Sequence, residues 1–275
     1  MKTVFPESLN LAHPDRLILT IYTGTEHLSY SIYNPEETGS YFYNELSGEK
    51  PFDSLENFNE SVFKHTFFSL PFLKVQILNR TPNFTFVPDS MYKDENKEDF
   101  FQLLFSEPKG LIMTDSLPSA GMKILHHLPE NIHLFMKHLF SKQDFIHYST
   151  PLISYFIKKR SMSGSRQMIV NLQEKGLDIF CFSRETLLMG NYFPTKNLQE
   201  ALYYILFTWK QLQLNQLEDC IQIIGNSFFS EELIEQLTLY IQHIRFPSFP
   251  SHICFKDVET ERIPFELAAL TVCEL

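Results

Sequence analysis

The sequence predicts an α/β protein made of two similar lobes, each a mixed β-sheet flanked by helices. Two observations carry this prediction. Three short strand patterns followed by a capped helix occupy residues 165–212, and the same order recurs near the amino end of the chain. After each such unit the pattern turns to alternating strands and helices, which is typical of a sheet covered by helices.

The length and composition allow two medium-sized lobes. A chain of 275 residues should bury roughly three-quarters of the surface that it exposes when unfolded. The hydrophobic fraction of 44%, with 27 phenylalanines, is that of an ordered globular protein rather than a disordered one. We therefore expect any linkers to be short.

In the second unit, alternating apolar residues predict strands at 165–173, 176–183 and 186–193. Short polar turns separate them, which indicates a meander of antiparallel strands. Asn197, with Glu200 three residues later, is a capping signature for the helix that follows.

The helix after Asn197 is apolar on nearly every side. Tyr203, Tyr204 and Phe207 cover much of the face opposite its main apolar stripe. We therefore expect other elements to enclose this helix. The stripe itself consists of residues at helical spacing, namely Leu198, Ala201, Leu202, Ile205, Leu206, Trp209 and Leu212.

The first unit repeats this order near the amino end. Strands at 17–23 and 28–33 form a hairpin, and residues 39–43 supply a third strand. Asp53, with Glu56 three residues later, then caps a helix. We interpret the two units as copies of one supersecondary unit.

The remaining elements complete the two lobes. We expect the first lobe to span residues 1–160, with a small inserted sub-domain at about 88–142, and the second to span residues 161–275. Further strands are expected at 74–78, 84–87, 110–113, 122–126, 144–148 and 220–224, and helices at 98–105, 132–140, 150–160, 230–241 and 264–273.

A formal net charge of -10 argues against general binding to nucleic acids or anionic membranes, because both need cationic surface on the protein. Lys158, Lys159, Arg160 and Arg166 form a local exception. They lie at the end of a predicted helix, where cations complement the helix dipole. An anion site stays open as the alternative.

The cysteines indicate a reducing compartment. Cys181, Cys220, Cys254 and Cys273 show no C-x-x-C pairing and lie in apolar runs, so we expect buried thiols rather than disulfides. The amino end carries no apolar run of signal-peptide length, and no stretch approaches the about 18 apolar residues of a membrane span. We therefore expect a cytoplasmic protein without a membrane span.

The duplicated meander and helix, with an inserted sub-domain and a terminal apolar helix, resembles the actin-like ATPase fold, which is a duplicated ribonuclease H-like fold. Within that fold the chain is similar to bacterial pilus-assembly and cell-division proteins. Residues 17–33, 84–88, 147–151 and 187–206 look more closely like an uncharacterised family of Bacteroidetes proteins, a domain of unknown function. That family carries no known activity to transfer.

Active actin-like enzymes carry the motif D-x-G-[ST] in the first turn of each lobe. The carboxylate organises the water shell of Mg²⁺, and the glycine lets backbone N–H groups reach the phosphates. Here the first turn reads Tyr22-Thr-Gly-Thr25, so the resemblance implies nucleotide contacts at Gly24 and Thr25. Tyr22 stands where the acid should be, and a bulky phenol cannot replace a carboxylate that orders the metal.

The second turn departs further from the motif. Asn171 replaces the acid, and the glycine is displaced to Gly176. The nucleoside-binding turn of such enzymes is usually a glycine pair after a strand, and Gly225 keeps one glycine of that pair. An ordinary strand-to-helix turn also explains Gly225, and we favour that interpretation. Gly24, Thr25 and Gly225 are thus candidate cofactor-binding residues only if a nucleotide binds.

No other catalytic motif is present, and we predict neither a catalytic residue nor a metal site. The sequence lacks a Walker loop, H-E-x-x-H, G-x-S-x-G and a Rossmann glycine fingerprint. His133 and His138 are five residues apart and share no helical face well, so we expect these and the neighbouring His126 and His127 to be surface histidines. Two isolated carboxylates are interpreted as turn formers, Asp115 and Asp178.

Two functions from different classes follow. The first is a non-catalytic actin-like scaffold, with a degenerate nucleotide site and no cofactor, which holds another protein as the pilus-assembly relatives hold a short peptide. The second is a diverged ATPase or phosphotransferase that binds ATP with Mg²⁺. The acids missing at Tyr22 and Asn171 favour the first function, so we expect an unknown protein partner and no enzyme activity.

Overall fold

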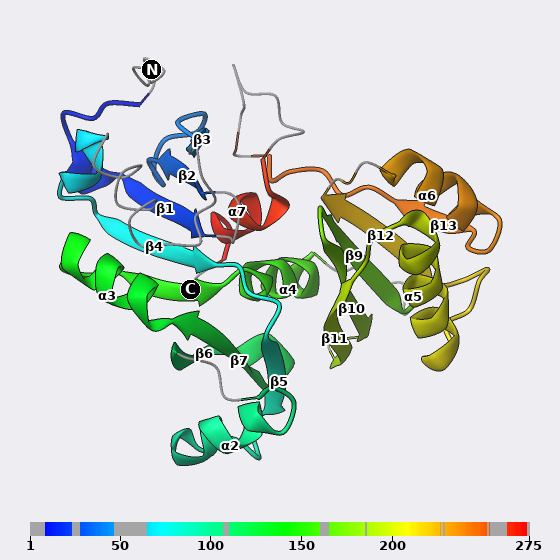
Figure 1. Ribbon diagram of the computed structural model, residues 1–275. Coiled ribbons are helices and arrows are strands. Elements are labelled where there is room, and N and C mark those ends of the chain that lie inside the picture. The colour runs from blue at the N-terminus through cyan, green and yellow to red at the C-terminus, as the bar shows by residue number, and fades with distance from the viewer. Residues whose placement is uncertain are drawn as a thin grey trace. The chain divides into compact units, whose positions relative to one another are not determined.

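The computed structural model describes residues 9–23, 28–46, 65–106, 110–159, 165–184, 186–225, 227, 229–251, 253 and 263–273. The chain divides into two compact units. Unit 1 comprises Met1–Ser116, Lys123–Tyr155 and Phe249–Leu275, and unit 2 comprises Leu117–Met122 and Phe156–Ser248. Each unit contains one five-stranded mixed sheet with its helices (Figure 1). The predicted two-lobed α/β architecture is confirmed.

The sheet of unit 1 has the strand order β3-β2-β1-β4-β8. Its first three strands form an antiparallel meander, and β4 and β8 add to β1 in parallel. These strands are β1 (Ile18–Thr23), β2 (Leu28–Tyr33), β3 (Phe42–Leu46), β4 (Lys74–Asn79) and β8 (Asp144–His147).

The sheet of unit 2 has the same pattern, in the order β11-β10-β9-β12-β13. The meander is again antiparallel, and β12 and β13 again add in parallel. The strands are β9 (Gln167–Gln173), β10 (Gly176–Ser183), β11 (Thr186–Pro194), β12 (Cys220–Gly225) and β13 (His243–Arg245). The predicted duplication of one supersecondary unit is therefore confirmed, and β13 is an additional strand that the sequence did not reveal.

The duplication holds at the level of single residues. The parallel ladder of unit 1 begins with Ile18 opposite Lys74, and that of unit 2 begins with Gln167 opposite Cys220. Counting four residues along β1 and β9 reaches Tyr22 and Asn171. These two residues therefore occupy the same place in the two sheets.

A third, smaller sheet has the order β5-β7-β6 and belongs to the inserted part of unit 1. Val87, Phe101 and Leu125 form its core. The sheet with its helices lies below β4 in Figure 1. Its strands are β5 (Phe84–Pro88), β6 (Gly110–Leu117) and β7 (Met122–Pro129), with η3 (Asp94–Asn96) and α2 (Lys97–Gln102) between β5 and β6. The short helix η4 (Pro118–Ala120) joins β6 to β7 and is grouped with unit 2.

Helix α3 (Glu130–Leu139) packs on the main sheet of unit 1 and not on the smaller sheet. Phe135 and Met136 share a core with Leu19, Ile77 and side chains of the short helix η2 (Thr66–Ser69). The part of the chain that forms a separate small sheet thus ends near 129, before the predicted end at about 142. A short helix η1 (Pro14–Arg16) precedes β1.

The C-terminal helix α7 (Phe265–Leu270) covers the other face of the main sheet of unit 1. Leu267 and Leu270 pack with Tyr22, Tyr43 and other side chains of the sheet. Residues 249–275 therefore belong to unit 1, although the sequence predicts them in the second lobe. The reason is that the apolar side of α7 meets a tyrosine-rich sheet face that lies more than 200 residues earlier in the chain.

In unit 2, α5 (Leu198–Gln211) and α6 (Ser230–Thr238) lie on one face of the sheet (Figure 1). The predicted cap is confirmed, because Glu200 donates its backbone N–H to Asn197 Oδ1 at 2.9 Å. The prediction that other elements enclose α5 is wrong. Tyr203 and Phe207 are 59% and 46% exposed, and their rings stack on each other with centroids 5.6 Å apart. The face of α5 that carries Ala201, Ile205 and Trp209 packs against the sheet.

The helix predicted after Asp53, together with Glu56, lies outside the described residues. Within the described parts of the chain, no helix is both long enough and apolar enough to cross a membrane. Helix α4 (Ser149–Lys158) follows β8 directly and begins the second half of the chain.

Candidate functional site

The first candidate position is Tyr22, near the end of β1. Its side chain is 5% exposed, and its hydroxyl donates a hydrogen bond to Oε1 of Glu266. Glu266 is 4% exposed and comes from α7, near the opposite end of the chain. A carboxylate therefore does lie beside the position where active actin-like enzymes carry an acid, but the phenol of Tyr22 occupies one of its oxygens.

The equivalent position in unit 2 is Asn171, which also lies beside a buried carboxylate. Asp178 is opposite Asn171 on β10 and is fully buried. Its Oδ2 accepts hydrogen bonds from Asn171 Nδ2 at 3.1 Å and from Gln173 Nε2 at 2.5 Å. The interpretation of Asp178 as a turn former is wrong, because its side chain points into the sheet and binds two amides.

Gly225 ends β12 with a φ of 72°, a backbone conformation that favours glycine. A Cβ at this position would lie 2.2 Å from the carbonyl oxygen of Leu172 and 2.8 Å from Oδ1 of Asn171. The glycine is thus required by close packing against β9 whether or not a nucleotide binds. The other two predicted cofactor-binding residues, Gly24 and Thr25, lie outside the described residues.

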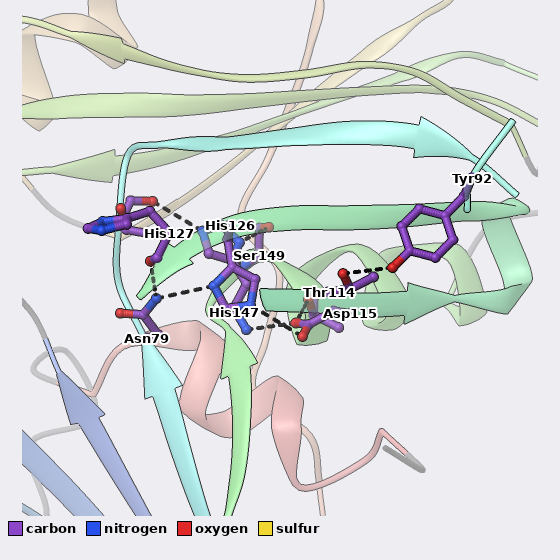
Figure 2. Close-up of polar contacts among 10 residues, drawn as sticks. Asn79, Tyr92, Thr114, Asp115, His126, His127, His147 and Ser149 are labelled. Carbon is purple, nitrogen blue, oxygen red and sulfur yellow. Dashed lines mark hydrogen bonds and ion pairs between the residues drawn. The ribbon is translucent and has the colours of Figure 1, made fainter. Parts of the chain in front are cut away.

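A second group of buried polar residues centres on Asp115 of β6, where the small sheet of unit 1 meets the carboxyl ends of β4 and β8 (Figure 2). Asp115 Oδ2 accepts a hydrogen bond from the backbone N–H of His147 at 2.7 Å and from the Thr150 hydroxyl at 2.5 Å. Its Oδ1 lies 3.4 Å from Nε2 of His126. The turn-former interpretation of Asp115 is therefore also wrong.

These donors stabilise the ionised form of the Asp115 carboxyl. Burial opposes ionisation of the carboxyl, yet the His126 ring, the Thr150 hydroxyl and the His147 backbone N–H hold its pKa below the ordinary value. A buried carboxylate needs several such hydrogen bonds to offset the loss of water. We therefore describe Asp115 as ionised.

The hydrogen bonds also fix the orientation of the His126 ring, which is fully buried. Asn79 Nδ2 donates one hydrogen to the carbonyl oxygen of His127 at 2.8 Å and the other to Nδ1 of His126 at 3.2 Å. The other ring nitrogen, Nε2, faces Asp115 Oδ1 at 3.4 Å. The prediction that His126 is a surface histidine is wrong.

His147 is the second fully buried histidine of this group. Its Nε2–H donates to the carbonyl oxygen of Thr81 at 3.1 Å, so Nδ1 accepts the hydrogen bond from the Ser149 hydroxyl at 2.6 Å. Burial, followed by the nearby His126, lowers the pKa of His147 to about 3. The ring is therefore neutral under ordinary conditions.

This group does not have the arrangement of a hydrolase. In a Ser-His-Asp triad the acid orients the histidine through the ring nitrogen that does not face the serine. Here that nitrogen of His147 binds the Thr81 carbonyl, and Asp115 binds the backbone of His147 instead. Ser149 is also fully buried. The network joins the small sheet to the main sheet, as Figure 2 shows for Asn79 and its neighbours.

Metal-binding and disulfide chemistry find no support within the described residues. They contain no group of three or more His, Cys, Asp or Glu side chains that could hold a metal ion. Cys181 and Cys220 are free and buried, as predicted, and burial raises the pKa of the Cys181 thiol to about 12. Cys273 forms no disulfide and is partly exposed, and Cys254 lies outside the described residues.

Residues 6–244 match the protein family described as "Protein of unknown function (DUF3822)". No protein with a curated description matches this sequence. A crystal structure from Bacteroides thetaiotaomicron VPI-5482, of a protein with an actin-like ATPase fold and unknown function, is similar to 97% of this chain. The likeness covers 99% of that chain at 25% sequence identity, with a TM-score of 0.85. The actin-like fold is therefore confirmed.

The PilM–PilN type IV pilus biogenesis complex is a more distant structural neighbour. It covers 92% of this chain and 96% of that chain, with 10% sequence identity and a TM-score of 0.50. This likeness shows the fold alone, and it agrees with the predicted similarity to pilus-assembly proteins.

Proposed function

The chain belongs to this family of proteins of unknown function, and we propose that it is a non-catalytic actin-like protein that binds another protein. The observation that carries the proposal is the hydrogen bond between Tyr22 and Glu266, both buried in unit 1. The phenol of Tyr22 stands in the place of the catalytic acid, and its hydroxyl binds the Glu266 carboxylate beside it.

The chemistry of phosphoryl transfer explains why this matters. Such reactions depend almost wholly on positioning and on a metal ion that neutralises charge on the phosphate oxygens. Mg²⁺ keeps most of its waters and is held through one or two carboxylates. In unit 1, Tyr22 places an apolar ring and a neutral hydroxyl there instead. In unit 2, Asn171 contributes an amide that is already bound to Asp178. We propose that the protein works without a bound nucleotide or metal.

Binding to a protein partner is supported by the structural neighbour that is named for a complex of two proteins, PilM and PilN. This support is an analogy between folds, and the same fold also serves other functions. The partner of this chain is a separate proposal, which the next subsection develops from the residues of unit 2.

A diverged ATPase or phosphotransferase is the second candidate function. Two buried carboxylates, Glu266 and Asp178, lie beside the two positions where active enzymes carry acids. If both were released from their present partners, they would supply the charge that an ATP–Mg²⁺ site needs. The candidate cofactor contacts would then be Gly24, Thr25 and Gly225.

The cell compartment is proposed on the cysteines. Cys181 and Cys220 are buried thiols without a disulfide partner, which is the usual state in a reducing cytoplasm. We propose a cytoplasmic protein. The net charge of -10 further supports a partner other than bulk nucleic acid.

The proposal is tested by titrating ATP with Mg²⁺ into the full chain in a calorimeter. We expect no saturable binding up to about 1 mM ATP. Glu266→Gln, which removes the charge beside Tyr22, should leave this result unchanged. Saturable binding tighter than about 10 µM that is lost in Glu266→Gln would favour the diverged enzyme instead.

A further inference from the structure

A pocket of about 1260 Å³ lies in unit 2, at the end of the sheet where β9 begins. Asn171 and Gln173 lie near the other end of β9, so this pocket is separate from the candidate nucleotide turn. Four segments form its wall: the start of β9, the β10–β11 turn, the loop after α5 and strand β13 (Figure 1).

An ion pair fixes one side of the pocket. Arg166 Nη2 lies 3.2 Å from Asp219 Oδ2, and Arg166 Nη1 donates to the carbonyl oxygen of Leu212 at 2.8 Å. Asp219 also accepts hydrogen bonds from the backbone N–H groups of Arg166 and Asn215, both at 2.7 Å. The charges of Arg166 and Asp219 therefore offset each other and hold the loop after α5 in place.

Two further arginines line the pocket, Arg184 and Arg245. Both side chains are exposed, and neither side chain forms an ion pair or hydrogen bond with another residue in the described part of the chain. The acid among the remaining lining residues is Glu218, which is exposed, and His243 adds a titratable ring. The pocket is thus cationic in a chain whose net charge is -10.

Arg184 has a φ of 51°, in the left-handed region. The β10–β11 turn joins Ser183 to Thr186 through two residues, and such tight turns prefer Asn or Gly at positive φ. An arginine in this conformation costs backbone energy that Asn or Gly would not.

Apolar groups complete the surface. Leu188 and Leu217 line the pocket and are 42% and 68% exposed. Leu188 belongs to β11, which is at the edge of the described sheet. Arg245 belongs to β13 at the opposite edge, so a segment that contacts both strands crosses the end of the sheet.

From these features we infer that the pocket binds an extended acidic peptide segment of a protein partner, with its carboxylates on Arg184 and Arg245 and an apolar side chain on Leu188 and Leu217. Arginine favours carboxylates because its planar fork can donate two parallel hydrogen bonds. The inference rests on the proposed protein-binding function and identifies its surface. A small anion is a poorer fit, because the volume exceeds that of ordinary small-ligand pockets.

The test uses the full chain and a labelled peptide of about nine alternating glutamate and leucine residues, a length typical of a long strand. Binding is followed by fluorescence anisotropy at about 0.02 M salt and again at about 0.3 M salt, which screens exposed charge pairs. Arg184→Gln combined with Arg245→Gln should weaken binding by about tenfold, as should a peptide with glutamine in place of glutamate. Arg16→Gln, an exposed arginine of unit 1, is the matched control and should leave binding unchanged.

Three results would overturn the inference: no peptide binding by the unmodified chain, equal binding by the double variant, or equal binding of the glutamine peptide. Displacement by about millimolar phosphate, but not by chloride at equal ionic strength, would assign the pocket to a small anion and also overturn it. Thermal unfolding followed by circular dichroism shows whether the variants stay folded. ATP turnover is measured on the same samples. Turnover would overturn the proposed function, whereas failed peptide binding without turnover overturns only the pocket assignment.

Discussion

Replacing Tyr22 by phenylalanine removes one hydroxyl from a buried pair and leaves the ring in place. The Glu266 carboxylate then loses a donor that it cannot replace with bulk water, because it is only 4% exposed. Hydrogen bonds to charged groups contribute about 1.5–3 kcal/mol, so we expect Tyr22→Phe to lower the free energy of unfolding of unit 1 by about that amount.

A double-mutant cycle separates this hydrogen bond from other effects of the ring. Glu266→Gln keeps an acceptor for the phenol and should cost less, about 1 kcal/mol. Once the charge is removed, Tyr22→Phe should also cost less, which gives a coupling energy of about 1 kcal/mol between the two sites. Leu73→Ala is the control within unit 1, because Leu73 is 59% exposed, and it should change stability by less than about 0.5 kcal/mol.

The assay must report on unit 1. The single tryptophan, Trp209, lies in unit 2, so its fluorescence follows that unit. Hydrogen exchange of the backbone amides in α7, read by mass spectrometry during urea unfolding, follows the element that carries Glu266. A loss below about 0.5 kcal/mol in Tyr22→Phe, or additivity in the cycle, would refute the reasoning.

Two further predictions follow from buried side chains. Trp209→Ala should lower the stability of unit 2 by about 3–5 kcal/mol in a denaturation followed by circular dichroism, because the ring is 3% exposed, whereas the half-exposed Phe207→Ala should cost much less; equal costs would show that α5 is packed on both sides. The pKa of His147 is lowered to about 3 in the folded protein. Between about pH 6.5 and pH 3 the imidazole therefore binds a proton in the unfolded chain but not in the native chain. The free energy of unfolding should therefore fall by up to about 1.4 kcal/mol per pH unit as the pH drops from about 6.5 towards 3. His147→Gln should remove this component, and an unchanged pH slope in that variant would contradict it.

Local sequence signals predict the order of elements well. The predicted strand at 176–183 and the Asn197 cap before α5 both agree with the structure, because neighbouring residues determine turns and caps. The sequence also pairs Tyr22 with Asn171 through the first turn of each unit, and in the structure each lies four residues after the start of its parallel ladder.

Contacts between residues far apart in the chain could not be predicted. Asp115 binds Thr150 across 35 residues, and Tyr22 binds Glu266 across 244. The roles of Asp115 and His126 do not follow from the sequence pattern, because a single polar residue fits a turn or the surface as well as the inward side of a strand. Each lies within a strand that the sequence predicts at least in part, and a polar residue on the inward side of a strand is the signal that could have found them.

The prediction that other elements enclose α5 failed for a related reason. Periodicity showed that the helix is apolar all round, which usually indicates burial. Tyr203 and Phe207 instead cover each other by stacking at the surface. The number of elements that pack around one helix is a property of the tertiary fold, and a single helical pattern does not determine it.

The central claim is that an actin-like fold here serves binding without ATP hydrolysis. Its most direct test is release of inorganic phosphate from ATP by the unmodified full chain with excess Mg²⁺, beside a heat-inactivated sample and the Glu266→Gln variant. We predict the same rate of release in all three samples, because Tyr22 occupies the place of the acid and binds the nearest carboxylate. Turnover above the heat-inactivated sample that is lost in Glu266→Gln would contradict the account and identify a diverged enzyme.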